Sequence, residues 1–386
     1  MASANRSPLP TVLDSRGELE FGITTLRPLC DSVRASLRDN RTLGPREGEI
    51  QKLLLAVVKG EYAGSSILSF ANIRDSHSDK LLLDMMEVRS STATTSDEYR
   101  ANNKIAHSLQ KHWQIRFRDE YFRIDHERLR RLLQTGRLKD VEFVGPRPGS
   151  CELWQAKTEQ VTTGLEGPQT LRAGHWWLNL ACAHRDGIVG SVSETPTKGR
   201  YDHAALPLMT GKEDVYVNKV KYCRYGTMAD MHISLMSRVS KEICVLRGSG
   251  LFSPLAPRAG VRYDGKYRIK AYSIVWKPQM GMYQLELEMT RSILESPATE
   301  RPPGTKDGEV KQPHMKEVVQ APTPSEMDEW RLYEMYETEL LRQRLGSTVF
   351  MDWYQQKAAK QFERDHWRRM NELRLDLGKL WEAMGV

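Results

Sequence analysis

The stretch Gly260–Lys270, which reads GVRYDGKYRIK, decides how the middle of this chain folds. Its segment Tyr263-Asp264-Gly265 predicts a tight turn, because glycine adopts positive φ angles without steric cost. After this segment, Tyr267 and Ile269 alternate with basic residues, which is the period-two pattern of a half-buried strand. We therefore expect a turn that leads into a strand with one apolar face.

Length, composition and cysteine usage indicate a soluble protein of several domains. The chain has 386 residues, of which 39% are hydrophobic and 28% charged. It contains no apolar run long enough for a membrane helix, and its first residues lack the apolar segment of a secretory signal. The five cysteines are scattered without a C-x-x-C pair, which argues against a zinc site or a disulfide framework. We expect no metal, no cofactor and no membrane partner, and a reducing compartment, cytosol or nucleus.

Three segments read as unstructured or connecting. Residues 1–22 and 293–324 are polar, contain proline and show no apolar periodicity, so we expect both to be disordered. Residues 136–171 are rich in glycine and proline, which predicts a connector between domains.

Three other segments read as folded. Residues 23–135 carry apolar positions at three- and four-residue spacing, which predicts a helical domain. Residues 172–292 contain short alternating runs between turn residues, as in a β-barrel or sandwich. Residues 325–386 read as two helices with aromatic apolar stripes. Because two helices bury little surface by themselves, we expect this hairpin to pack on another domain or on a second copy.

The middle of the chain carries the excess positive charge. Residues 174–291 contain 17 Lys and Arg against 10 Asp and Glu, an excess that equals the formal net charge of +7 of the whole chain. A basic domain between near-neutral neighbours indicates a polyanionic partner. On charge alone, a solvated basic surface is an equally good interpretation.

The same region resembles the SRA (SET- and RING-associated) domain, also called YDG after its signature. The matching blocks are Gly174–Trp177, His184–Gly190, Ile243–Gly248, Ser253–Pro257 and the signature stretch Gly260–Gly265. They stand in the order of the family. Helices before the domain, without a SET or RING motif, resemble a fungal version of this architecture.

The resemblance implies an α+β chain in which a PUA-like SRA β-barrel is flanked by an N-terminal helical domain and C-terminal helices. Such barrels bind DNA and flip a 5-methylcytosine into a pocket, since the whole edge of a cytosine cannot be read inside the duplex. By the family pattern, Tyr201 is the first stacking ring and Asp202 accepts from the cytosine amine. Met209 replaces the second tyrosine of the pattern, just before Thr210 and Gly211. Alternatively, Tyr201 and Asp202 form an ordinary turn.

A basic segment lies where the family has a finger that enters the DNA groove. By this resemblance, Asn218, Lys219, Lys221 and Arg224 contact the DNA backbone or groove. An exposed basic loop without a partner is the alternative. We interpret Tyr263 and Asp264 in the signature stretch as structural rather than as base contacts.

Together these features predict a nuclear, chromatin-associated protein that binds double-stranded DNA, with methylated CpG as a candidate target. The alternative is a structural or protein-interaction scaffold that keeps a degenerate SRA barrel as its core. Such a scaffold forms a homodimer or binds a protein partner through its C-terminal helices, for instance as a coiled coil. The sequence has no H-E-x-x-H, Walker or G-x-S-x-G motif, so we expect no enzymatic activity.

Overall fold

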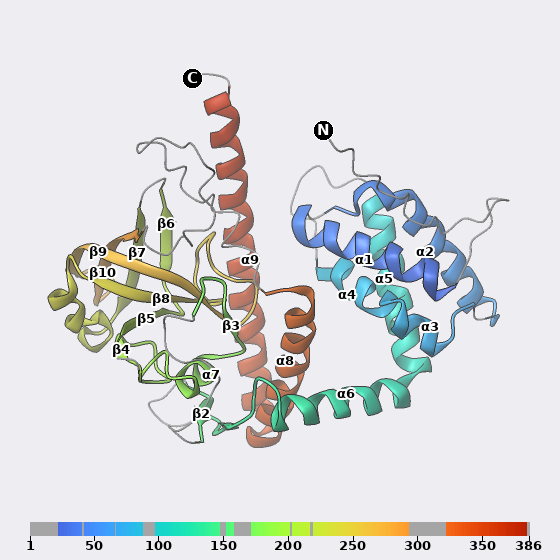
Figure 1. Ribbon diagram of the computed structural model, residues 1–386, viewed down its shortest axis with the longest axis horizontal. Helices are drawn as coiled ribbons and strands as arrows, with labels where there is room; N and C mark the ends of the chain where they lie inside the picture. Colours follow the sequence, from blue (N-terminus) through green and yellow to red (C-terminus); the bar gives the residue numbers. More distant parts are fainter. Residues whose placement is uncertain are drawn as a thin grey trace, which may run out of the picture. The chain divides into compact units, whose positions relative to one another are not determined.

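The chain folds as an α+β protein, with helices first, a mixed sheet in the middle and helices again at the end (Figure 1). The sequence predicted this class. The computed structural model describes residues 22–40, 42–65, 67–87, 97–146, 152–157, 171–200, 203–216, 219–292 and 322–383. The segments predicted to be disordered, 1–22 and 293–324, lie almost entirely outside these ranges. Two compact units are present, Met1–Glu127 and Arg128–Val386.

The first unit is a bundle of helices around one apolar core. Its helices are α1 (Ile23–Asn40), α2 (Glu47–Tyr62), α3 (Phe70–Asp75), α4 (Ser78–Glu87), α5 (Asp97–Arg116) and the first part of α6 (Arg118–Gln134), with a 3-10 turn at Gly44–Arg46. Leu26, Leu29 and Val33 of α1 follow a three- and four-residue spacing and are fully buried. Trp113 joins this core and donates its indole N–H to the buried Glu61. The apolar periodicity of the sequence therefore marks the core-facing side of the bundle.

The second unit is built on a mixed sheet (Figure 1). Its strands are β3 (Trp176–Trp177), β4 (Thr197–Lys198), β5 (Ala204–Leu208), β6 (Lys212–Val215), β7 (Val220–Gly226), β8 (Glu242–Gly248), β9 (Val261–Lys277) and β10 (Met282–Arg291). The order is β4-β5-β8-β9-β10-β7-β6, with β3 paired to the start of β9. Strands β5 and β8 are parallel, and the other described pairs are antiparallel. In β9, Tyr267 and Ile269 are buried while Arg268 and Lys270 are exposed, as the sequence predicted.

The predicted turn at Tyr263-Asp264-Gly265 is wrong, because this segment lies inside strand β9. The register between β8 and β9 shifts here, so that Asp264 and Gly265 together face a single residue of β8. Gly265 has a φ of 94°, which a residue with a side chain rarely adopts. The glycine that suggested a turn therefore permits a β-bulge, which increases the local twist of the strand.

A buried ionic network surrounds this bulge. Arg247 of β8 donates through Nε and Nη2 to Glu213 of β6, at 2.8 and 2.9 Å, and through Nη1 to Asp264, at 2.6 Å. Asp264 also pairs with Arg262, and all four side chains are at most 1% exposed. Two cations and two carboxylates balance in charge. Strand β6 is the last in the order of the sheet, and β8 is near the opposite end of that order. The contact between Glu213 of β6 and Arg247 of β8 therefore requires the sheet to curl on itself.

Backbone hydrogen bonds close the same seam. The amide of Glu213 donates to the carbonyl of Phe252, at 2.9 Å, and the amide of Phe252 donates to the carbonyl of Gly211, at 3.0 Å. Phe252 follows β8 in the chain, so β6 returns to the segment beside β8. The sheet is therefore curled into a barrel, and Asp264 has the structural role that the sequence suggested.

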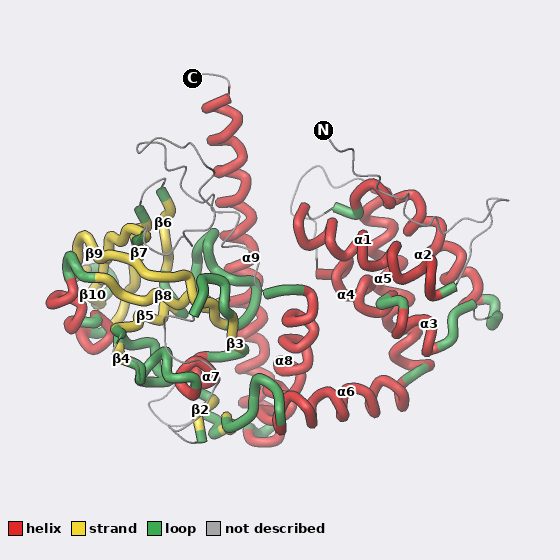
Figure 2. Tube along the Cα trace, viewed as in Figure 1, coloured by secondary structure: helices red, strands yellow, loops and turns green. Residues whose placement is uncertain are grey.

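The C-terminal helices α8 (Pro324–Arg344) and α9 (Ser347–Ala383) belong to the same unit as the sheet (Figure 2). Tyr333 and Leu341 of α8 are buried, and Tyr333 lies in a core shared with α7 (Leu180–Arg185). Arg368 of α9 donates to the carbonyls of Ser249 and Pro257, at 3.0 and 3.1 Å, which holds α9 on the loop after β8. None of the described helices combines the length and apolar character that crossing a membrane requires.

The region 136–171, predicted as a connector, contributes to the second unit in its described part. It carries the antiparallel strands β1 (Val141–Phe143) and β2 (Trp154–Ala156). Leu138, Trp154 and Leu171 are buried in the same core as Tyr333 of α8. The division between the two units falls within α6, a few residues earlier.

Candidate nucleic-acid interface

Three predicted site residues, Tyr201, Asp202 and Asn218, lie outside the described residues. The chain that leads to Tyr201 is described and tightly held. The amide of Arg200 donates to the carbonyl of Gly187, at 2.8 Å. A Cβ on Gly199 would lie 2.1 Å from that same carbonyl oxygen, so no side chain fits there. The His184–Gly190 block thus holds the backbone at Gly199 and Arg200, the last described residues of this segment.

The predicted residues Met209, Thr210 and Gly211 form the turn between β5 and β6. The carboxylate of Glu194 accepts from the amides of Met209 and Thr210, at 2.7 and 2.8 Å, and from the Thr210 hydroxyl, at 2.6 Å. Gly211 has a φ of 87°, and a Cβ there would lie 2.7 Å from the carbonyl oxygen of Cys223. This turn is therefore a rigid element whose conformation depends on Glu194 and on a glycine.

Met209 points inward from this turn. A Cβ on Gly248 of β8 would lie 2.6 Å from its Cε and 2.7 Å from its Sδ, and Met209 packs on the core of the unit. The thioether thus fills the space above a glycine of the barrel wall, where a larger side chain on β8 does not fit.

The side chain of Arg224, on β7, is mostly buried and contacts Glu194, the residue that binds the Met209–Gly211 turn. Its guanidinium is 3.2 Å from Glu194, 3.5 Å from Asp230 and 3.3 Å from Nε2 of His232. Its side chain is only 17% exposed. Hydrogen bonds from Thr227 lower the pKa of Asp230, so this carboxylate stays charged beside Arg224. Arg224, which was predicted to contact DNA, therefore links two loops. One loop carries Glu194, and the other carries Asp230 and His232 at the 3-10 turns Met228–Met231 and Ile233–Arg238.

Lys219 and Lys221 lie on the outer face of the sheet, and each is paired. Lys219 is 3.1 Å from Glu288, and Lys221 is 3.0 Å from Glu286, both on β10. The hydrogen bond with Glu286 raises the pKa of Lys221. These side chains and Tyr216 line a shallow hollow of about 390 Å³. Because exposed ion pairs contribute little energy, phosphates can replace the two carboxylates as partners.

Helix α9 brings Arg364 close to the turn at Met209, and Lys360 precedes Arg364 by one helical turn. A Cβ on Gly250 would lie 2.6 Å from the carbonyl oxygen of Met209 and 3.4 Å from Nη1 of Arg364. Burial lowers the pKa of Arg364. Among described residues, neither Arg364 nor Lys360 has a carboxylate within ion-pair distance, although Asp365 and Glu334 are close enough to Arg364 to favour its charge. These two cations, together with Glu194, Asp230 and His232, are features of the site that the sequence reasoning missed.

Replacing Glu194 by glutamine is expected to lower the free energy of unfolding by about 1–3 kcal/mol, because several hydrogen bonds to a charged acceptor weaken or are lost. Hydrogen exchange at the Met209–Gly211 turn, read by mass spectrometry, measures the effect. Glu242→Gln is the matched control, since its carboxylate meets the exposed Arg268 at 3.7 Å and should contribute less than about 1 kcal/mol. Equal exchange in both variants would show that Glu194 does not hold the turn.

In the described ranges, no three His, Cys, Asp or Glu side chains are grouped so as to hold a metal ion. No family model matches the chain, and no curated protein matches it.

Solved structures show weak similarity over 32% of the chain. The modification-dependent TagI restriction endonuclease has a TM-score of 0.27 and 16% identity, and the match spans 50% of its chain. Arabidopsis thaliana SUVH6 in complex with SAM has a TM-score of 0.25 and 15% identity, over 26% of its chain. The SUVH5 SRA complex with fully methylated CG DNA has a TM-score of 0.24 and 12% identity, over 90% of its chain. The chain thus spans half the TagI structure, and similarity at this level assigns it to no family.

Proposed function

We propose that the second unit binds double-stranded DNA in the nucleus and receives a flipped cytosine, with 5-methylcytosine as the preferred base, beside the Met209–Gly211 turn. The observation that carries this proposal is the turn itself, clamped by Glu194. Tyr201 and Asp202 follow directly on the anchored residues Gly199 and Arg200. A prearranged turn lowers the ordering cost of binding, which strengthens recognition of one base.

The expected energetics are modest. Flipping a base out of the stack costs a few kcal/mol, and each aromatic ring that stacks on it contributes roughly 1–3 kcal/mol. In this proposal only Tyr201 stacks, because Met209 packs on Gly248 instead of offering a second surface. Asp202 accepts from the cytosine amine, as the resemblance to SRA domains implies. We propose a reader without catalytic activity, in which phosphate contacts supply much of the affinity.

Lys360 and Arg364 of α9, Lys221 of β7 and Lys219 directly before β7 are the proposed phosphate contacts. Fluorescence anisotropy with duplex DNA over a KCl series tests them. Neutralising about four phosphates gives a slope of log K against log [KCl] of roughly −3 to −4. Lys360→Gln with Arg364→Gln should make this slope shallower by about 2. Lys241→Gln is the control, since Lys241 precedes β8 at the end opposite Gly248 and Gly250.

Absence of salt-dependent binding to any duplex at low salt would reject the proposed function. An unchanged slope in the α9 double variant would remove only these two residues from the interface.

A second candidate function is self-association through the C-terminal helices. It is favoured by large apolar side chains of α9 that remain exposed: Val349, Met351, Tyr354, Phe362 and Met370. Light scattering after size exclusion, with the full chain and with a chain that ends before α9 at residue 347, tests it. A monomer in both cases would exclude this candidate.

A further inference from the structure

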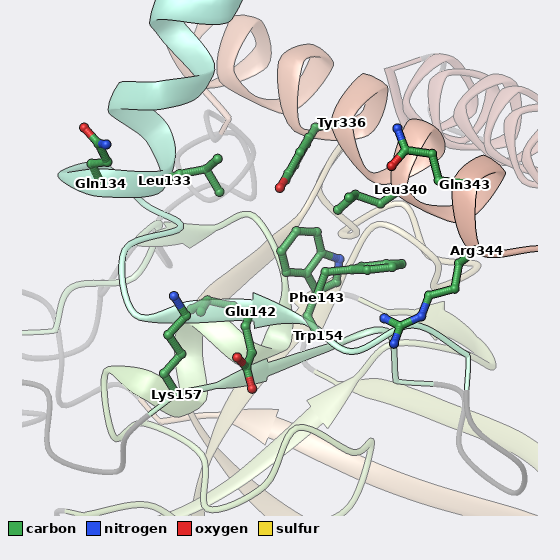
Figure 3. Close-up of a pocket in the computed structure, with 11 residues that line it drawn as sticks. Leu133, Gln134, Glu142, Phe143, Trp154, Lys157, Tyr336, Leu340, Gln343 and Arg344 are labelled. Atoms are coloured by element: carbon green, nitrogen blue, oxygen red, sulfur yellow. The ribbon is translucent and has the colours of Figure 1, made fainter.

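A cavity of about 690 Å³ lies where the end of α6, the β1–β2 pair and α8 meet (Figure 3). All three elements belong to the second unit in this part of the chain. Its volume is within the range of sites that bind small molecules or short peptide segments. The cavity is separate from the proposed DNA interface, since the two share no residue.

The walls of the cavity are aromatic and fixed. Trp154 is 5% exposed and donates its indole N–H to Glu337, at 2.7 Å. Phe143 meets Trp154 edge to face, with ring centroids 5.3 Å apart, and Tyr336 lies 6.3 Å from Trp154. Figure 3 shows Tyr336 and Leu340 on one side of the cavity, facing Phe143 and Trp154 on the other. Rigid rings of this kind hold an apolar group with little loss of their own entropy.

The hydroxyl of Tyr336 has no hydrogen-bond partner in the described part of the chain. Burial raises the pKa of Tyr336, so the group remains an O–H donor at neutral pH. A donor that lines a cavity without an acceptor favours a ligand that brings one, such as a carbonyl or a carboxylate.

The rim of the cavity has two cations without a partner. Among described residues, neither Lys157 nor Arg344 has a carboxylate within ion-pair distance. The one acidic side chain of the lining, Glu142, already accepts from Gln155. In Figure 3, Lys157 and Arg344 stand at opposite ends of the cavity, with the aromatic rings between them. The rim therefore attracts negative charge at two separate points.

We infer that this cavity binds an acidic peptide segment with one aromatic or large aliphatic anchor. The anchor packs on the apolar lining formed by Phe143, Tyr336 and Leu340, and acidic side chains on either side of it pair with Lys157 and Arg344. The Tyr336 hydroxyl donates to a carbonyl of the segment. The separation of the two cations by an apolar floor selects an extended ligand over a compact anion, which meets only one of them. This inference is independent of DNA binding.

Selection of a displayed library of random nonapeptides on the full chain tests the inference. We expect enrichment of sequences with an aromatic or large aliphatic residue between Asp or Glu residues. Lys157→Glu and Arg344→Glu should each weaken the selected peptides about tenfold or more, because attraction becomes repulsion. Tyr336→Phe, which removes only the hydroxyl, should weaken them severalfold.

Arg342→Glu is the matched control, because Arg342 is 63% exposed, pairs with Glu339 and does not line the cavity. Its affinity for the selected peptides should stay near that of the wild type. The inference is overturned if no peptide is enriched or if the enriched peptides lack acidic residues. It is equally overturned if both charge reversals at the rim leave binding unchanged.

Discussion

Replacing Arg247 by methionine is expected to lower the free energy of unfolding of the sheet-containing unit by about 3–5 kcal/mol, the cost of breaking a buried ion pair from one side. Burial opposes the charge of Arg247, but Glu213, Tyr267 and Asp264 outweigh it and raise the pKa of the guanidinium well above its ordinary value. Without Arg247, Asp264 retains Arg262 as its partner. Glu213 retains only the hydroxyl of Ser253 among its buried contacts in the network.

Hydrogen exchange of the β8 and β9 amides, read by mass spectrometry, measures this loss within one unit. A difference of 3–5 kcal/mol corresponds to exchange faster by on the order of 10² to 10³ or more. The matched control is Arg268→Met on the neighbouring strand β9, because Arg268 is 3.7 Å from Glu242 and this ion pair is about half exposed. It should change exchange by less than about fivefold. Similar exchange in both variants would mean that the network does not close the barrel.

Acidification is expected to destabilise the same unit through His232. Burial first, and the Arg224 guanidinium second, lower the pKa of His232 from 6.5 to about 4. Between these values the unfolded chain binds a proton that the folded chain excludes, so stability falls as the pH falls. The contribution is complete above pH 6.5 and lost toward pH 4. It amounts to about 3 kcal/mol at about 1.4 kcal/mol per pH unit.

Asparagine at position 232 separates this effect from other titrations. His232 has a φ of 48°, a conformation that asparagine tolerates better than most residues. Calorimetry at pH 7.5 and 4.5 compares the wild type with His232→Asn. The transition to follow is the one whose midpoint temperature Arg247→Met lowers. His232→Asn should lose less thermal stability on acidification than the wild type does. Equal losses would show that Asp230 or groups elsewhere, rather than His232, carry the pH dependence.

The sequence predicted elements better than it predicted their partners. The alternation around Tyr267 and Ile269 identified a half-buried strand, and the helical periodicity of residues 23–135 identified the first core. The pair Asp264-Gly265 led to the wrong prediction of a turn, because a glycine with positive φ occurs in β-bulges as well as in turns. Only the pairing of β8 with β9, which depends on distant residues, separates the two cases.

The candidate site shows the same limit. Glu194 stands alone in a loop, and no spacing relates it to the turn that it clamps. Lys219 and Lys221 looked like free cations, since the register that places Glu288 and Glu286 beside them is not visible in the sequence. The contact of Asp230 with Thr227 could have been predicted from the sequence, because Thr227-x-x-Asp230 has the spacing of a capping box.

Affinity for unmodified, hemimethylated and fully methylated CpG duplexes, with and without Tyr201→Ala, tests the central claim most directly. Fluorescence anisotropy at one fixed salt concentration provides the measurement. The wild type should bind a methylated duplex about fourfold tighter than the unmodified one, because the pocket buries one additional methyl group, worth about 0.8 kcal/mol. Tyr201→Ala should abolish this preference and leave the salt dependence unchanged, since Tyr201 contacts the base and not a phosphate. Equal affinity of the wild type for all three duplexes, or a preference that survives Tyr201→Ala, would contradict the proposed recognition.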